Sequence, residues 1–131
     1  MILVDTSIWI ELLNGRLSES LTHDDLRLVV TCGPIVQEVL QGLRDHPAAK
    51  QFRSAFLAVP CLSDPLPLSS FLEASEIYRL GRQKGFTVRS STDCLIAAIA
   101  IRHQIPVWHR DRDYANIARF TALQTIDKAE A

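Results

Sequence analysis

Short apolar runs alternate with longer stretches of helical spacing along the chain. Runs of strand length lie at residues 2–4, 28–30, 106–108 and 123–126, with a shorter one near Val59. Apolar residues at helical spacing lie at residues 8–13, 34–43, 69–83, 93–103 and 113–119, and Pro47 begins a further helix. Buried strands that alternate with helices predict an α/β fold, a doubly wound domain whose central parallel sheet is covered by helices on both faces. Residues 1–131 contain no repeat or linker, so we expect a single domain.

Capping and turn residues are expected to bound the first helices. Thr6 or Ser7 is a suitable N-cap for the first helix, and Asn14-Gly15 is suited to end it. Gly42 is expected to interrupt the helix at 34–43. We expect the aromatic residues of the later helices to lie in the core. If they are exposed instead, they would form a groove for a partner helix. These aromatic residues are Phe52, Phe56, Phe71 and Tyr78.

The composition is that of a folded globular protein. Hydrophobic residues make up 47% of the chain and charged residues 22%. The N-terminus has no basic segment, and no apolar run approaches the roughly 18 residues of a membrane span. The three cysteines, Cys32, Cys61 and Cys94, form no CxxC pair and are expected to be buried thiols. We therefore expect a cytoplasmic protein without a membrane segment.

Positive charge is concentrated in one part of the chain. Residues 79–119 contain eight basic residues and three acids, a net charge of +5, although the whole chain carries only −1. This segment can form a basic surface for a polyanion, or its charges can simply lie on solvated helix faces.

Four carboxylates lie where a parallel sheet would bring them together. Asp5 directly follows the strand at 2–4, and Asp111 follows the strand at 106–108, so both are expected at the C-terminal edge of the sheet. Asp93 lies in the first turn of an apolar helix, where residues 90–92 or Asp93 itself offer the N-cap. Glu38 lies away from the apolar stripe of its helix. Taken singly, each has an ordinary explanation as a turn, cap or solvated residue.

Convergence of these acids would require a cation. Two carboxylates about 4 Å apart repel by roughly 4 kcal/mol at an effective dielectric of 20. Ligands that are all oxygen favour a hard ion such as Mg²⁺ or Mn²⁺. Such an ion lowers the pKa of water and stabilises charge on phosphate oxygens, which suits phosphodiester hydrolysis.

Four ordered motifs resemble those of the PIN-domain nucleases, and most closely the VapC toxins of type II toxin–antitoxin pairs. The motifs are residues 1–10 (MILVDTSIWI), 35–42 (IVQEVLQG), 91–98 (STDCLIAA) and 108–114 (WHRDRDY). The resemblance implies an Mg²⁺- or Mn²⁺-dependent endoribonuclease with Asp5, Glu38 and Asp93 at the core acidic positions. It implies Asp111 as the fourth acid, with Asp113 as a second candidate. It also implies an RNA substrate, often tRNA, 5′-phosphate and 3′-hydroxyl product ends, a homodimer, and a VapB-like antitoxin partner.

Several further residues are weaker candidates for the same site. In the resembling family a hydroxyl next to the first acid can touch the metal, which makes Ser7 a candidate, whereas Thr6 is favoured as a cap. The basic residues that flank the acids suit phosphate contacts, although each can equally pair with a surface carboxylate; these are Arg89, Arg110 and Arg112. The chain departs from the family pattern at His109, where a hydroxyl residue is common, and at Tyr114, where phenylalanine is usual. His109 is a candidate substrate contact or a histidine without a role.

Two other functions compete with the ribonuclease. One is a catalytically silent or DNA-associated PIN protein that acts as a partner-binding module, against which the intact set of acids argues. The other is a phosphoacceptor signalling domain, which needs a basic residue after the last strand. Lys128 is a poor candidate for that residue, and the arrangement leaves Glu38 without a function.

Overall fold

The computed structural model describes residues 1–15 and 27–127, in which five short strands alternate with helices. The strands are β1 (Ile2–Val4), β2 (Val29–Cys32), β3 (Cys61–Leu62), β4 (Val107–His109) and β5 (Thr125–Asp127). The helices are α1 (Thr6–Leu13), α3 (Gly33–Leu43), α4 (Ala49–Leu57), α5 (Leu68–Gln83), α6 (Ser91–His103) and α7 (Arg112–Ala118).

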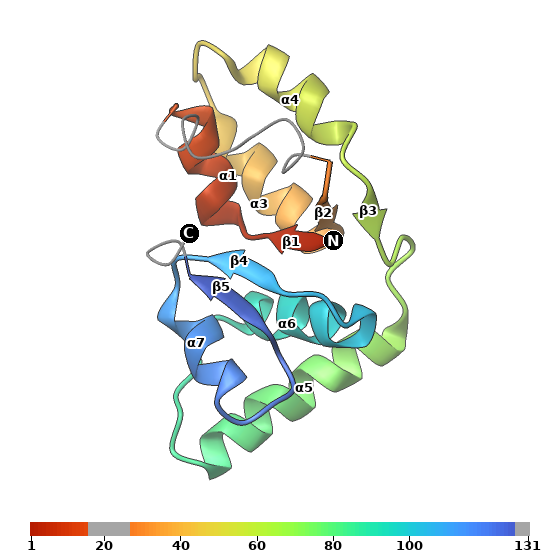
Figure 1. Cartoon of the computed structure of the whole chain (residues 1–131), viewed down its shortest axis with the longest axis vertical. Helices are drawn as coiled ribbons and strands as arrows, with labels where there is room; N and C mark the ends of the chain where they lie inside the picture. Colours follow the sequence, from red (N-terminus) through yellow and green to blue (C-terminus); the bar gives the residue numbers. More distant parts are fainter. Residues whose placement is uncertain (16–26, 128–131) are drawn as a thin grey trace.

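All neighbouring strands pair in parallel, in the order β3-β2-β1-β4-β5. Right-handed crossovers from β1 toward β3 place α1, α3 and α4 on one face, and the crossovers toward β5 place α5, α6 and α7 on the other. Figure 1 shows these two groups of helices on opposite sides of the strands. The predicted doubly wound α/β fold is confirmed.

The core covers both faces of the central strands, and on one of them it is formed with the apolar helix α6. Leu3 and Val4 of β1 and Val107 of β4 are fully buried, because a parallel sheet covered on both faces leaves its central strands no solvent. Ile96 and Ile99 of α6 are equally buried. Helix α6 therefore has the central position that the apolar pattern predicts. Its packing against the strands determines where its first turn lies relative to the strand ends.

Several local predictions were wrong. Asp5, and not Thr6 or Ser7, is the N-cap of α1, because its carboxylate accepts from the Ser7 backbone amide. Helix α3 continues through Gly42, since one glycine costs a helix only about 1 kcal/mol. The last strand begins two residues later than expected, at Thr125.

The surface also differs from expectation at some apolar positions. Cys61 is exposed, whereas Cys32 and Cys94 are buried as predicted. Phe56 is a core residue, but Phe71 and Tyr78 are 48% and 40% exposed on α5. No helix within residues 1–15 and 27–127 is long and apolar enough to cross a membrane. Lys128, the residue of the phosphoacceptor hypothesis, lies outside the described residues.

Candidate active site

The strand order reverses between β1 and β4, and acidic residues follow both strands at this point. In open parallel sheets the functional crevice lies beyond the C-terminal ends of the strands at such a reversal. The backbone amide of Asp5 donates to the Trp108 carbonyl at 2.9 Å, which extends the pairing of β1 with β4 up to the site. Asp111 follows β4 and is the N-cap of α7, its Oδ1 accepting from the Asp113 amide at 2.9 Å.

Three aspartates, from α6, the β4–α7 connection and the first turn of α7, form a compact group. Asp93, Asp111 and Asp113 each offer a carboxylate oxygen within 4.8 Å of the other two. Asp93 lies in the first turn of α6, where its backbone amide donates to the N-cap Ser90 at 3.3 Å. Both candidates for the fourth acid are thus close to Asp93.

Asp5 is connected to this group by a tyrosine. The hydroxyl of Tyr114, a fully buried residue of α7, donates to Asp5 Oδ1 at 2.9 Å. The Ser7 hydroxyl donates to the other oxygen, Oδ2, at 3.0 Å. The Tyr114 hydroxyl also lies close enough to Asp93 for the two groups to shift each other's pKa. The sequence signal for this role was the tyrosine at a position where the resembling family usually has phenylalanine.

Glu38 reaches the same region from α3. Thr6, the residue after Asp5, donates through its hydroxyl to Glu38 Oε1 at 2.9 Å. Thr6 therefore positions a candidate acid and does not cap its helix. Periodicity on α3 did not indicate this contact, because it joins two helices far apart in the sequence.

Asp93 is the acid of the site whose ionisation is made costly by its surroundings. Burial, followed by the charges of Asp5 and Asp111, raises the pKa of Asp93 to about 8, while the polar interaction with the Tyr114 hydroxyl opposes this rise. Burial and the charges of Asp5 and Asp93 raise the pKa of the Tyr114 hydroxyl well above its usual value, so it remains a proton donor. Burial raises the pKa of the nearby Cys32 thiol to about 12, which excludes a thiolate nucleophile at neutral pH.

The site has the ligands that a hard divalent cation requires. All its acids offer carboxylate oxygen, the ligand type of Mg²⁺ and Mn²⁺. Oδ2 of Asp93 is buried and has no hydrogen-bond partner within the described part of the chain. An unsatisfied buried carboxylate oxygen is unfavourable unless something binds it. The residues present therefore fit such an ion.

The three basic residues and His109 occupy four different environments. The Arg89 amide donates to Asp113 Oδ2 at 3.1 Å, and its Nε lies 3.9 Å from Asp113 Oδ1. Arg110 forms an ion pair with the buried Glu11 of α1, a contact that sequence reasoning missed. His109 is 1% exposed, and its Nδ1 accepts from the Asp111 amide at 3.1 Å. It therefore supports the loop between β4 and α7 from the protein interior. Arg112 is exposed at the start of α7.

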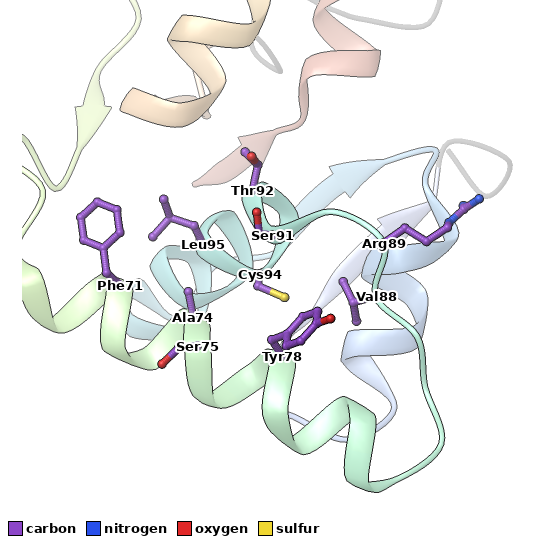
Figure 2. A pocket seen from close by; sticks show the side chains of 10 residues that line it. All are labelled: Phe71, Ala74, Ser75, Tyr78, Val88, Arg89, Ser91, Thr92, Cys94 and Leu95. Atoms are coloured by element: carbon purple, nitrogen blue, oxygen red, sulfur yellow. The ribbon is translucent and has the colours of Figure 1, made fainter.

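A pocket of about 610 Å³ lies beside the site, between α5 and the first turns of α6. Figure 2 shows Tyr78, Val88 and Cys94 close together in it, with Arg89 extending away from them. Leu68, Phe71 and Leu72 add exposed apolar area along α5. The prediction that Phe71 and Tyr78 are core residues is wrong, and α5 instead presents an apolar face.

A profile of the PIN domain family matches residues 2–120. The chain belongs to the PIN-domain family. This PIN domain is 38% identical over 130 residues to ribonuclease VapC11 of Mycobacterium tuberculosis, covering 95% of this chain and 96% of that protein. A VapC ribonuclease of Mycobacterium bovis has the same identity and coverage.

Solved toxin–antitoxin complexes contain chains of the same fold. A chain of VapBC2 from Rickettsia felis, bound to a promoter DNA fragment, superposes with a TM-score of 0.72 at 18% identity, covering 97% of this PIN domain and 98% of that chain. A chain of VapBC-5 from Mycobacterium tuberculosis superposes with a TM-score of 0.63 at 23% identity, covering 95% and 96%. At these identities the likeness concerns the fold.

Proposed function

We propose that this PIN domain is a metal-dependent endoribonuclease, the toxin of a type II toxin–antitoxin pair. The observation that carries the proposal is the convergence of Asp93, Asp111 and Asp113 within 4.8 Å at the reversal of the sheet. The identity with VapC ribonucleases over nearly the whole chain supports the substrate class. The chain is proposed to act as one domain over residues 1–131.

Asp5, Glu38, Asp93 and Asp111 would hold Mg²⁺ or Mn²⁺, which supplies activation of water and stabilisation of phosphate charge when bound. Between the two candidates for the fourth acid, Asp111 is favoured. Both oxygens of Asp113 face Arg89, and the residue is 2% exposed, whereas Asp111 is half-buried at the rim. Asp113 would support the site through its contacts with Arg89 and would not bind the ion itself.

RNA would reach the carboxylates past exposed arginines. Arg89 and Arg112 are exposed next to the acids and are proposed to contact substrate phosphates. Arg110 is a weaker candidate because its guanidinium is engaged by Glu11. His109 would act through the loop that carries Asp111, and Ser7 through Asp5.

The protein partners are proposed from the solved relatives and the surface of α5. Structures of VapBC complexes share the fold, which supports a VapB-like antitoxin as partner. Exposed Leu68, Phe71 and Leu72 on α5 provide apolar area of the kind that protein contacts bury, which is consistent with assembly, including a homodimer. We place the protein in the cytoplasm, where RNA and antitoxin are available.

Cleavage of a labelled tRNA transcript tests the activity. Wild-type protein is incubated with Mg²⁺ or Mn²⁺ and, in parallel, with EDTA; Asp5→Asn and Asp45→Asn are compared with it. Asp45 is an exposed acid outside the site, so Asp45→Asn is the matched control. We expect 5′-phosphate and 3′-hydroxyl ends, loss of cleavage in EDTA, and a fall of roughly 100-fold or more in Asp5→Asn.

Three results would contradict the proposal. Cleavage at the wild-type rate by Asp5→Asn, or 2′,3′-cyclic phosphate ends, would reject the carboxylate mechanism. No cleavage of any RNA by a folded protein that still binds its antitoxin would favour the catalytically silent, partner-binding alternative.

A further inference from the structure

The backbone at Asp5 is held firmly, but its carboxylate needs separate positioning. The Asp5 amide is bonded to Trp108 at the end of the β1–β4 pairing, and the Asp5 carbonyl accepts from Ile8 and Trp9 in the first turn of α1. These contacts leave only the side-chain torsions free. An aspartate that faces other acids turns away from them unless donors hold its oxygens, because like charges repel.

One hydroxyl donates to each oxygen, and the Ser7 backbone amide donates to Oδ2 as well, at 3.5 Å. Tyr114 donates to Oδ1 at 2.9 Å and Ser7 donates to Oδ2 at 3.0 Å. A carboxylate oxygen has about two lone-pair sites, so Oδ1, which accepts the bond from Tyr114, keeps capacity for a cation. The donors therefore orient Asp5 without closing it to an ion.

The tyrosine itself has little freedom to move. Its side chain is 0% exposed, and its ring lies 5.2 Å from the ring of His109, tilted by 46°. His109 in turn accepts from the Asp111 amide. The hydroxyl is thus held between β4, α7 and the end of β1, and it couples Asp5 to the loop that carries Asp111.

We propose that Tyr114 is a positioning residue, whose hydroxyl holds the Asp5 carboxylate beside Asp93 in the orientation that binds the divalent cation. The inference rests on the proposed function. A phenylalanine ring would fill the same space, so packing alone does not require the hydroxyl. Groups that orient metal ligands typically contribute roughly 10- to 100-fold to metal affinity.

Calorimetric titration with Mn²⁺ tests the proposal, with wild type, Tyr114→Phe and Tyr78→Phe compared at one pH. Tyr78 is the chain's other tyrosine and is exposed on α5, so Tyr78→Phe is the matched control. We expect Tyr114→Phe to weaken Mn²⁺ binding roughly tenfold and Tyr78→Phe to leave it unchanged. Urea denaturation of each variant in EDTA measures any purely structural effect separately.

The outcomes separate the two proposals. Wild-type Mn²⁺ affinity in a folded Tyr114→Phe overturns the positioning role, even if its stability falls, and leaves the proposed function standing. No Mn²⁺ binding by wild type overturns both. If Tyr114→Phe does not fold, a crystal structure of wild type with Mn²⁺ decides: a hydroxyl still bonded to Asp5 beside the ion supports the role, and a hydroxyl turned away from Asp5 rejects it.

Discussion

Replacing Asp93 by asparagine should stabilise the metal-free protein at neutral pH and leave its stability unchanged at pH 4. Asparagine has the shape of the protonated acid, so it preserves packing at the start of α6 and removes only the charge. In the wild type, burial and the charges of Asp5 and Asp111 raise the pKa of Asp93 to about 8, from 3.8 in the unfolded chain. Between these values the native state holds a proton that the unfolded state has released, so wild-type stability falls as pH rises.

The size of the effect follows from the distance between the two pKa values. At about 1.4 kcal/mol per pH unit, the three units between pH 4 and pH 7 set an upper limit of about 4 kcal/mol. Some water reaches buried charges in real proteins, so we expect about 2–4 kcal/mol. With a mid-range urea m-value of about 2 kcal/mol/M, the midpoint of Asp93→Asn should lie about 1–2 M above that of wild type at pH 7.

Urea denaturation in EDTA, followed by tryptophan fluorescence, measures this difference at several pH values between 4 and 9. Trp108 lies on β4 directly before the site and serves as a native probe. Asp45→Asn replaces an exposed acid and should follow the wild-type curve. If wild type and Asp93→Asn show the same pH dependence, Asp93 is not the buried, repelled carboxylate inferred here.

Three further predictions concern contacts around the site. Thr6→Val removes the hydroxyl that donates to Glu38 and should lower cleavage at limiting Mn²⁺ roughly tenfold, at a cost of about 1 kcal/mol in stability; unchanged cleavage would mean that Glu38 needs no such support. Arg110→Ala removes the guanidinium that faces the buried Glu11 and should lower the free energy of unfolding, measured in urea, by about 2 kcal/mol. This loss is smaller than for a fully buried ion pair because Arg110 is half exposed, and a loss below about 0.5 kcal/mol would contradict the prediction. Mn²⁺ at 100 times its Kd should stabilise wild type by about 2.7 kcal/mol in a thermal shift assay. Equal stabilisation of Asp93→Asn would mean that the ion binds away from Asp93.

The sheet edge and two of its acids were predictable because strand direction fixes them. A residue that directly follows a buried parallel strand must lie at the C-terminal edge, and both Asp5 and Asp111 do. The apolar pattern of α6 likewise required a central helix, which brought Asp93 near that edge. These inferences use chain direction and periodicity, which are local properties of the sequence.

Contacts between elements were not predictable in the same way. Whether the Tyr114 hydroxyl meets Asp5 depends on how α7 is rotated and packed against β4, and no local pattern encodes that rotation. The pairing of Arg110 with Glu11 joins residues from opposite ends of the chain. The exposure of Phe71 was missed because a helix face that packs in the core and one that packs on a partner have the same apolar pattern.

The arrangement of helix ends explains how the metal-free fold tolerates this many acids in one place. Asp5 and Asp111 are N-caps, and Asp93 lies in a first turn, so each carboxylate faces the partial positive charge of a helix N-terminus. Those dipoles contribute typically 0.3–1 kcal/mol each, up to about 2 kcal/mol when partly buried. They are not sufficient for Asp93, whose pKa still lies near 8. The helix ends leave part of the negative charge without stabilisation, and a divalent ion would neutralise that part. The geometry that makes the metal-free protein less stable would therefore also be the source of any affinity for such an ion.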